Sequence, residues 1–364
     1  MNGAGARLRL VGGGPVSLAC ALFLVRRGVP AATLVLDPPP LPGAPVQAAL
    51  AARTLALSDG SRQLLERIAP LPEAGRIERV EVSLRGHAGR TRIVAPDLGV
   101  AALGHVVRYG ALLESLRRAA AAHRWSAPDA DTRAVALTVH AEGDTGEDAD
   151  VRDFGQSALL TDVHAPRADP ALHGTAFERF TPEGPLALLP LPEAGCWTVV
   201  WCDTAERCEA LRADGPDAAS AALRLRFGDA LGPLAVRGPL VVAPLVRRAR
   251  RRVAAPGEVW IGNAAQSLHP VAGQGLNLGL RDAFELADAL AAARRGGATP
   301  DAAVAAWVRR RRADRGLTIV LTDLLAASFT WPLARALQSP LLAALDLLPP
   351  LRRPLAAQLM FGLR

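Results

Sequence analysis

The first forty residues carry the apolar spacing of a strand, a helix and a second strand. Residues 8–11 form a short apolar run that predicts a buried strand. Residues 18–27 place apolar side chains at helical intervals, and Gly28 then predicts the end of that helix. A second apolar run, residues 33–36, ends at Asp37. This order of elements predicts a β-α-β unit.

Short strands dominate the pattern in the middle of the chain. Residues 80–84 alternate between apolar and polar side chains, which predicts a half-buried strand. Residues 175–191 and 197–202 predict strands of a second sheet. By contrast, residues 127–153 are polar and acidic, and they contain one predicted strand at 134–139.

Helical spacing returns toward the end of the chain. Residues 259–261 predict one more short buried strand, again followed by a glycine. Residues 281–295 predict a helix that Gly296 closes. Residues 299–301 then combine a capping threonine with a proline, which predicts the start of another helix. Together these segments predict an α/β fold with two sheets.

The charge of the chain is strongly positive, and two explanations stay open. The 364 residues carry a formal net charge of +7 and a pI of about 10.5, and all 42 basic residues are arginines. Biased codon usage explains such a lysine-free chain, and attraction to anionic lipid or phosphate is the alternative. Nucleic-acid binding is not expected, because the arginines are dispersed and only 4% of residues are aromatic.

No segment predicts a membrane span, a secretion signal or a metal site. The longest apolar stretch, residues 317–334, is interrupted by Asp323 and Pro332. The N-terminus lacks a basic region followed by an apolar run. The four cysteines form no C-x-x-C pair, and no Cys/His cluster has zinc spacing. We therefore expect a cytoplasmic protein, with peripheral contact to the inner face of the membrane as an option.

The first motif that carries chemistry is Gly12-x-Gly14-x-x-Ser17. Gly12 would allow a tight strand-to-helix turn, and Gly14 would let the backbone approach a pyrophosphate at the helix N-terminus. Asp37 ends the next strand, where it could accept hydrogen bonds from an adenosine ribose. The motif therefore predicts dinucleotide binding, and a merely structural glycine turn is the alternative.

The second motif spans residues 262–283 and contains four glycines, at 262, 273, 275 and 279. A predicted buried strand leads into it and a predicted helix follows it. So many glycines in one such segment indicate that the backbone closely approaches something flat or charged. A structural loop is the alternative, and it explains the concentration of glycines less well.

These segments resemble a known family. The chain is similar to the class A flavin-dependent aromatic monooxygenases, the group that includes para-hydroxybenzoate hydroxylase. Residues 262–283 resemble the signature of the ubiquinone-biosynthesis hydroxylases. Residues 82–89, 177–187 and 200–202 resemble the 2-polyprenyl-6-methoxyphenol hydroxylase (UbiH-type) branch.

The resemblance implies an α/β fold with a Rossmann-like FAD-binding domain, an inserted mainly-β substrate domain and a C-terminal helical segment. The FAD-binding domain would comprise three parts, residues 1–75, 108–153 (shortened) and 246–316. The substrate domain would comprise residues 76–107 and the sheet of 154–245, and residues 317–364 would be helical. That last region would lie on a membrane surface, against partner subunits or on its own domain.

The resemblance also implies roles for individual residues. The ADP half of FAD would be held by Gly12, Gly14, Pro15 and Asp37. Further cofactor contacts would come from Arg53, Arg108, Gly262, Asn263, Gly275, Leu276 and Asn277. The environment of the flavin ring would be formed by Pro270, Gly273, Gln274 and Gly275, with no acid or base assigned. For Arg108, a solvated arginine at a helix start is the equal alternative.

Three polar residues are tempting as acids or bases. Glu178 and Arg179 are neighbours in a predicted strand, so their side chains should point to opposite faces of the sheet. We therefore expect both to be structural. His269 is expected to orient its neighbours rather than to act as a base.

One departure from the family pattern concerns its middle Asp-Gly motif. The matching place here is Ala141-Glu142-Gly143-Asp144, and the stretch before it, residues 127–139, is about one hairpin short. This shortening is either natural economy or a weakening of FAD binding.

The implied activity is hydroxylation of the aromatic ring of a prenylated phenol in ubiquinone biosynthesis. The reaction would use dioxygen, FAD and a flavin C4a-hydroperoxide, with NAD(P)H or another donor as reductant. Two alternatives stay open: a related flavin monooxygenase acting on a soluble aromatic, and a flavin-poor scaffold subunit of a biosynthetic complex.

Overall fold

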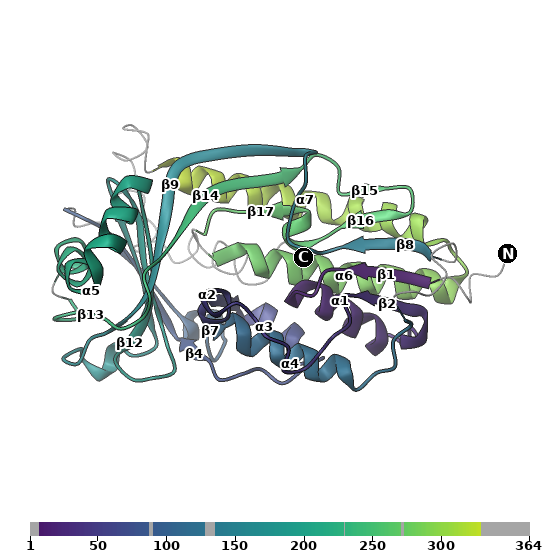
Figure 1. Ribbon diagram of the computed structural model, residues 1–364, viewed down its shortest axis with the longest axis horizontal. Coiled ribbons are helices and arrows are strands. Elements are labelled where there is room, and N and C mark those ends of the chain that lie inside the picture. The colour runs from purple at the N-terminus through teal and green to yellow at the C-terminus, as the bar shows by residue number, and fades with distance from the viewer. Residues whose placement is uncertain (1–6, 87–89, 128–134, 229, 271–272, 329–364) are drawn as a thin grey trace.

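The computed structural model describes residues 7–86, 90–127, 135–228, 230–270 and 273–328. Two sheets lie toward opposite ends of an elongated molecule, and the long strands β9 and β14 run between them (Figure 1). A third, smaller sheet lies between the two. The α/β class with a second sheet, expected from the sequence, is confirmed.

The first sheet is five-stranded and mostly parallel, as a dinucleotide-binding unit requires. Its strand order is β15 (Ala254–Ala255), β16 (Glu258–Trp260), β8 (Val135–His140), β1 (Arg7–Val11) and β2 (Leu34–Asp37). Its core includes residues of α1 (Pro15–Arg26), α4 (Tyr109–Ala121), α6 (Gln274–Gly296) and α7 (Pro300–Ser328).

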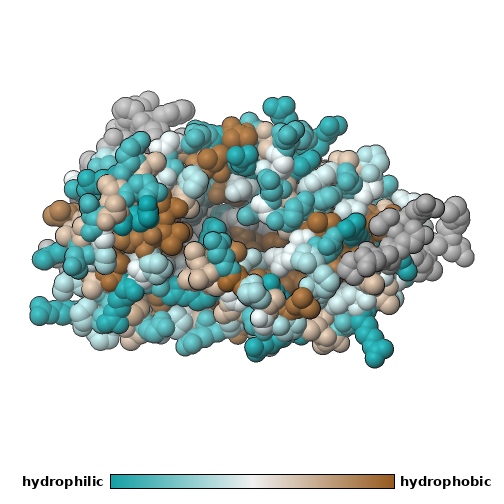
Figure 2. Space-filling view, viewed as in Figure 1, coloured by the Kyte–Doolittle hydropathy of each residue, from teal (hydrophilic) through white to brown (hydrophobic). Residues whose placement is uncertain are grey.

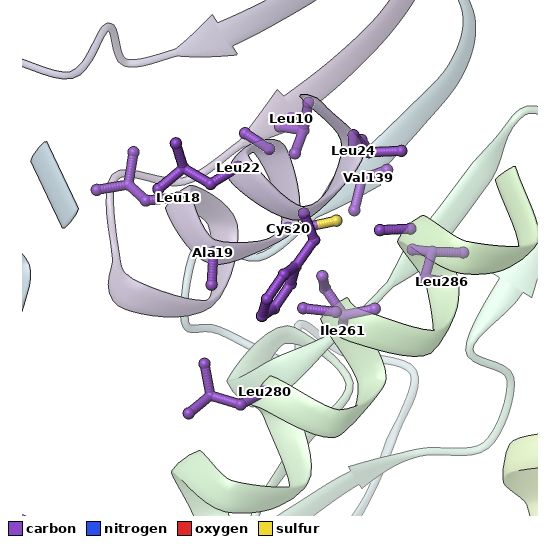
Figure 3. Packing of buried hydrophobic residues seen from close by; sticks show 14 of the residues in the cluster. Leu10, Leu18, Ala19, Cys20, Leu22, Leu24, Val139, Ile261, Leu280 and Leu286 are labelled. Atoms are coloured by element: carbon purple, nitrogen blue, oxygen red, sulfur yellow. The ribbon is translucent and has the colours of Figure 1, made fainter. Parts of the chain in front are cut away.

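This core joins segments from the whole length of the chain. Figure 3 shows Leu10, Cys20, Val139, Ile261 and Leu286 clustered in a single apolar core. Phe23 of α1 is fully buried, and its ring meets that of Phe284 edge-on, with 5.4 Å between the ring centroids. The first sheet is therefore held by contacts between residues that are far apart in the sequence.

The second sheet has nine strands, most of them antiparallel to their neighbours. Its order is β17 (Gln266–Ser267), β14 (Val241–Arg250), β9 (Ala149–His164), β12 (Cys196–Asp203), β11 (Gly184–Pro190), β10 (Thr175–Thr181), β5 (Arg79–Leu84) and β6 (Arg90–Val94), with β13 (Ala235–Val236) paired to β9. Helix α5 (Ala205–Phe227) covers one face of this sheet. The apolar core between helix and sheet includes Phe177, Trp197 and Trp201.

The small third sheet lies between the other two. It consists of β3 (Thr54–Ser58), β7 (Gly104–Arg108) and β4 (Gly75–Ile77), with α2 (Ala48–Ala52) before it and α3 (Asp59–Leu65) after β3. The short helices of the chain are η1 (Ala31–Thr33), η2 (Ala95–Leu98), η4 (Pro170–Leu172) and η5 (Gly262–Ala264). This sheet contacts both neighbours and so fixes the spacing between them.

The structure corrects the sequence prediction in three places. β9 begins at Ala149, inside a stretch predicted to be largely irregular, because its polar first half is stabilised by pairing with β14 rather than by burial. α6 begins at Gln274, seven residues before the predicted start, because Gly273, Gly275 and Gly279 gave this stretch the appearance of a loop. α5 was not predicted, and Gly215 and Pro216 interrupt its pattern with a kink.

The last described helix, α7, extends beyond the boundary that the sequence predicted. α7 continues through residue 317, the expected start of the C-terminal region, and residues 329–364 lie outside the described part. Within the described residues, no helix combines the length and the apolar character needed to cross a bilayer. All four cysteines are free, and Cys20 is a buried core residue as expected.

We predict that Phe23→Ala lowers the free energy of unfolding by about 3–5 kcal/mol, since it empties a fully buried ring position. Chemical denaturation of the purified protein measures the change. The control is Leu225→Ala, at a helix position that is 78% exposed, where a change within about 0.5 kcal/mol is expected. Equal effects of the two substitutions would contradict the assignment of this core.

Candidate cofactor and active site

The turn between β1 and α1 accepts only glycine at position 12. Gly12 has a φ of +118°, and a Cβ there would lie 2.5 Å from the carbonyl oxygen of Ala141. Its N–H donates to the carbonyl of Asp37 at 2.7 Å, and the N–H of Ala141 donates to the carbonyl of Val11 at 2.8 Å. The turn is therefore clamped between the carboxyl ends of β2 and β8, where α/β proteins bind dinucleotides.

The N-terminus of α1 is left open beside this turn. Gly14 is the N-cap and supplies no capping side chain, and the first turn contains no acidic residue. A Cβ at Gly14 would meet only the hydroxyl of Tyr109, at 3.8 Å. Pro15 follows as the first helical residue. Free backbone N–H groups and the helix dipole make this end suitable for a phosphate.

Asp37 lies at the end of β2, where the sequence places a ribose contact. Its carboxylate is 36% exposed and forms an ion pair with the guanidinium of Arg9, on the neighbouring strand β1. Asp37 thus remains reachable, but it already shares its charge with a cation. The pattern did not single out Arg9, because it sits in a strand predicted to be simply buried.

The second glycine segment packs against the first. Gly262 has a φ of +60°, and a Cβ there would lie 3.0 Å from Cγ1 of Val16 on α1. A Cβ at Gly279 of α6 would lie 3.0 Å from both the Cα of Gly262 and Cγ2 of Val16. These two glycines serve close packing of three segments. The neighbouring Asn263 has an exposed side chain.

A second open helix terminus lies at the start of α6. Gly273 is its N-cap, with a φ of +58°, no capping side chain and no acid in the first turn. A Cβ at Gly275 would meet nothing within 4 Å, so open space adjoins the first turn. The N–H of Gly273 donates to the carbonyl of half-buried Pro270 at 2.9 Å. Val271 and Ala272 lie outside the described residues.

The remaining predicted residues of this segment face the protein itself. Asn277 is buried: it donates to the carbonyls of Ala56 and Gly273 at 2.9 and 2.8 Å and accepts from the N–H of Ser58 at 2.9 Å. It therefore fastens the start of α6 to β3. Leu276 packs against the main core, and Gln274 is buried.

Arg53 and Tyr109 adjoin strands β3 and β7 of the small sheet, and the Tyr109 hydroxyl lies near the α1 terminus. Arg53 has an exposed side chain, and its carbonyl accepts the N–H of Tyr109 at 2.8 Å. Burial raises the pKa of the Tyr109 hydroxyl, and the charges of Arg117 and Arg53 oppose that rise. Tyr109 was missed from the sequence, although it directly follows the predicted contact Arg108.

Arg108 joins the small sheet to the nine-stranded sheet. Its guanidinium donates to both carboxylate oxygens of Asp162 on β9, at 3.3 and 2.6 Å, and to the carbonyl of Ala52 at 2.9 Å. Beside it, Thr54 donates to the hydroxyl of Thr198 at 3.1 Å. These polar contacts set how far the second sheet stands from the cofactor side of the molecule.

Glu178 and Arg179 do point to opposite faces of β10. Arg179 lies on the α5 side, where its Nε donates to the carbonyl of Arg226 at 3.0 Å. Glu178 lies on the other side, which also carries Thr198 and Asp162 by strand register. Figure 2 shows the molecular surface hollowed near its middle, with hydrophobic residues gathered around the hollow.

His269 is buried at the end of this region. Its ring meets the Phe154 ring edge-on, with 5.0 Å between centroids. Burial lowers the pKa of His269 to about 4, so the imidazole is neutral near pH 7. A neutral, tightly packed histidine fits the expected orienting role better than that of a general base.

The altered middle motif is well anchored. The ring of His140 stacks on that of Trp260 at 5.0 Å, and its two nitrogens lie 3.1 Å from Glu142 and 3.3 Å from Glu258. Gly143 follows with a φ of +98°. Residues 128–134 make up much of the stretch that was expected to be one hairpin short, and they lie outside the described part.

A buried charge network behind α6 was not foreseen. Arg311 of α7 contacts Asp282 at 2.9 Å and Asp314 at 2.7 Å, and Arg281 contacts Asp314 at 3.3 Å. Gln266 donates to Asp282 at 2.9 Å. The network locks α6 against α7, and its sequence signal was the adjacent pair of opposite charges, Arg281 and Asp282, within an apolar stretch of α6.

The site as a whole fits a flavin dinucleotide. Two uncapped helix N-termini, at Gly14 and Gly273, face outward from one packed unit, and open space adjoins Gly14 and Gly275. The predicted contacts Arg53 and Asn263 both have exposed side chains. Among the described residues, no group of three or more His, Cys, Asp or Glu side chains is arranged to hold a metal ion.

Comparison with solved structures supports the fold. p-Nitrophenol 4-monooxygenase PnpA from Pseudomonas putida superimposes with a TM-score of 0.71 and 18% identity, covering 99% of each chain. The flavin-dependent brominase Bmp2 superimposes with a TM-score of 0.72 and 14% identity, covering 98% of this chain and 93% of the other. The expected fold, similar to that of para-hydroxybenzoate hydroxylase, is confirmed.

Curated relatives match shorter stretches. The ubiquinone hydroxylase UbiL of Rhodospirillum rubrum is 37% identical over 49% of this chain and 41% of its own length. The 3-demethoxyubiquinol 3-hydroxylase of Escherichia coli is 36% identical over 39% of this chain and 35% of its own length. An uncharacterized protein of Synechocystis is 28% identical over 79% of this chain and 77% of its own length. The chain thus matches less than half the length of the two named hydroxylases.

The family profile described as "FAD binding domain" matches residues 135–317, half of the chain, from the start of β8 into α7. This stretch includes the middle motif, the second glycine segment and the open N-terminus of α6. The chain belongs to the FAD-binding domain family, and FAD is its cofactor.

Proposed function

We propose that this chain is an FAD-dependent monooxygenase that hydroxylates the aromatic ring of a prenylated phenol in ubiquinone biosynthesis. The observation that carries the proposal is the open α6 terminus, which belongs to the same packed unit as the dinucleotide turn. The names of the matched relatives, a ubiquinone hydroxylase and a demethoxyubiquinol hydroxylase, support this choice of substrate.

In this proposal the α1 terminus holds the diphosphate of FAD. Gly12 and Gly14 leave room for the phosphates, and the helix that begins at Pro15 offers the free backbone N–H groups of its first turn. Asp37 would accept from the ribose, and Arg53 and Asn263 would reach the diphosphate and ribityl chain. Arg108 then acts through Asp162, by holding the small sheet in register with the second sheet, and does not itself touch the cofactor.

The N-terminus of α6 would meet the flavin ring. Its free N–H groups and dipole favour negative charge at the ring edge, by about 0.3–2 kcal/mol. Pro270, Gly273, Gln274 and Gly275 border the ring, and Gly262, Leu276 and Asn277 hold the segment in place behind it. Bound FAD supplies the oxygen-activating chemistry, and the chain supplies position and shelter from water.

Two finer points belong to the same proposal. The reductant would be NAD(P)H or another electron donor. Because a polyprenyl substrate partitions into bilayers, the net charge of +7 would favour peripheral contact with an anionic membrane or with partner subunits.

We predict that Gly14→Asp weakens FAD binding roughly tenfold or more, because a carboxylate at the N-cap of α1 occupies and repels the phosphate position. FAD titration followed by fluorescence quenching measures the dissociation constant. The melting temperature of the FAD-free protein should hold or rise, since aspartate is a good N-cap.

The matched control is Gly14→Asn, which caps the helix with nearly the same shape and no charge. We expect a smaller loss of FAD affinity than with aspartate. Equal FAD affinity of the aspartate variant and the wild type would show that the phosphates do not lie at this terminus.

We predict that the FAD-loaded protein, given NADPH or NADH and a short-tailed 2-polyprenylphenol in detergent micelles, adds one oxygen atom to the ring. Incubation under ¹⁸O₂ followed by mass spectrometry should show the label in the product, since the oxygen derives from dioxygen. FAD binding without labelled product, under both donors, would overturn the hydroxylase assignment. Failure to bind FAD would favour a scaffold role.

A further inference from the structure

Glu178 is a carboxylate on the inner face of the nine-stranded sheet. In β10 it stands opposite Ala187 of β11 and Val82 of β5. The same cross-strand row continues through Val200 of β12 and Leu160 of β9. Between Glu178 and Leu160 this row is apolar, and at its other end Val82 stands opposite Thr91 of β6.

The rows on either side of this one are covered by other elements. The row of Ala176 and Leu189 packs with Val106 of the small sheet, in one apolar cluster. The row on the opposite side ends at Phe180, which packs with Leu325 and Ala326 of α7. Successive rows on one face lie about 7 Å apart. Glu178 therefore lies between the part of the sheet covered by the small sheet and the part covered by α7.

The small sheet connects this place to the proposed flavin position. The row of Ala176 includes Thr198, which accepts from Thr54 at the start of β3. Asn277 fastens the same strand to the open end of α6 through the carbonyl of Ala56. β3 thus contacts both this face of the nine-stranded sheet and the start of α6. An aromatic ring bound against the row of Glu178 would lie on the same face.

One oxygen of the half-buried Glu178 carboxyl has no bonding partner among the described residues. Oε2 is buried from solvent, and no donor among the described residues bonds to it. Burial raises the pKa of this carboxyl to about 7. Unsatisfied buried polar groups are rare and destabilising in native proteins, and those that persist with perturbed pKa values concentrate at functional sites.

We propose that Glu178 binds the ring hydroxyl of the phenolic substrate, with the aromatic ring lying on the apolar row of Val200 and Leu160. The inference rests on the proposed function. A carboxylate here accepts the hydroxyl proton: the substrate O–H bond breaks, the proton moves to a carboxylate oxygen of Glu178, and the electron pair stays on the phenolic oxygen. That pair raises the electron density of the ring positions to be hydroxylated.

Other charged side chains nearby fit this role less well. Arg179 faces α5 and donates to the carbonyl of Arg226. Asp162 is held by Arg108 in a bidentate ion pair. Cys202 of β12 lies on the same face, and burial together with Glu178 raises the pKa of its thiol far above neutrality. Glu178, by contrast, keeps a carboxylate oxygen, Oε2, that accepts no hydrogen bond from the described residues.

The test compares a 2-alkylphenol with its methyl ether, which lacks the hydroxyl hydrogen. Dissociation constants are measured on FAD-loaded protein from the change in flavin absorbance. The wild type should prefer the phenol by about tenfold or more, as a hydrogen bond to a charged group implies. Glu178→Leu should abolish that preference and Glu178→Gln should reduce it, with FAD affinity unchanged in both.

The matched control is Glu81→Gln, the same change on the opposite face of the same sheet. Glu81 pairs with Arg92 at 2.9 Å and should leave the preference intact. Persistence of the wild-type preference in Glu178→Leu would overturn the proposal. Wild-type protein that binds FAD but neither binds nor hydroxylates phenols would overturn the proposed function, and this inference with it.

A stability measurement separates a binding role from a structural one. The pKa of Glu178 in the folded protein, about 7, exceeds its ordinary value of 4.5, so the buried charge costs stability increasingly as pH rises from 4.5 through 7. The flanking Val82 and Ala187 are uncharged, and Cys202 stays protonated throughout this range.

We therefore predict that Glu178→Gln raises the melting temperature relative to wild type at pH 8 and that the difference shrinks at pH 5. Differential scanning fluorimetry at both pH values checks this. A group retained for structure would instead lower the melting temperature at pH 8 when replaced, and that result would contradict a binding role.

Discussion

The close approach of three backbone segments is the constraint on which the cofactor site depends. Gly12 admits the carbonyl of Ala141, and Gly262 and Gly279 let η5 and α6 pack against Val16. A Cβ at these positions would lie 2.5–3.0 Å from neighbouring atoms, so the segments would have to shift to admit a side chain. Both open helix termini project from this unit, so their relative placement is set by contacts that involve no flexible side chain.

The second sheet is placed by a different kind of interaction. Arg108 with Asp162, and Thr54 with Thr198, are polar contacts between half-buried or buried groups. Such contacts are directional, so they fix register and distance between sheets whose apolar faces would tolerate sliding. The nine-stranded sheet contributes an apolar cluster on β9, β12 and β14. The buried ion pairs of Arg311 and Asp282 join α6 to α7.

Local patterns predicted the β-α-β unit, most strands of the second sheet and both glycine segments, because each is encoded by periodicity or by residues that the backbone requires. The ion pair of Arg9 with Asp37 and the use of Asn277 as a clamp were not predictable, since both depend on which strands become neighbours. α5 escaped prediction because Gly215 and Pro216 break its pattern. The chemical context of Glu178 likewise emerges only from the register of the sheet.

The hydrogen bonds of Asn277 span about 220 positions of sequence, joining β3 to α6. Long-range pairings of this kind slow folding, because the chain entropy lost on closing a large loop precedes the gain from the contact. During synthesis, the N-terminal β-α-β unit therefore exists for most of the translation time without β16, η5 or α6. The proposed flavin pocket is thus among the last features to form, and the edge of β8 that pairs with β16 stays unpaired until residues 258–260 have been synthesised.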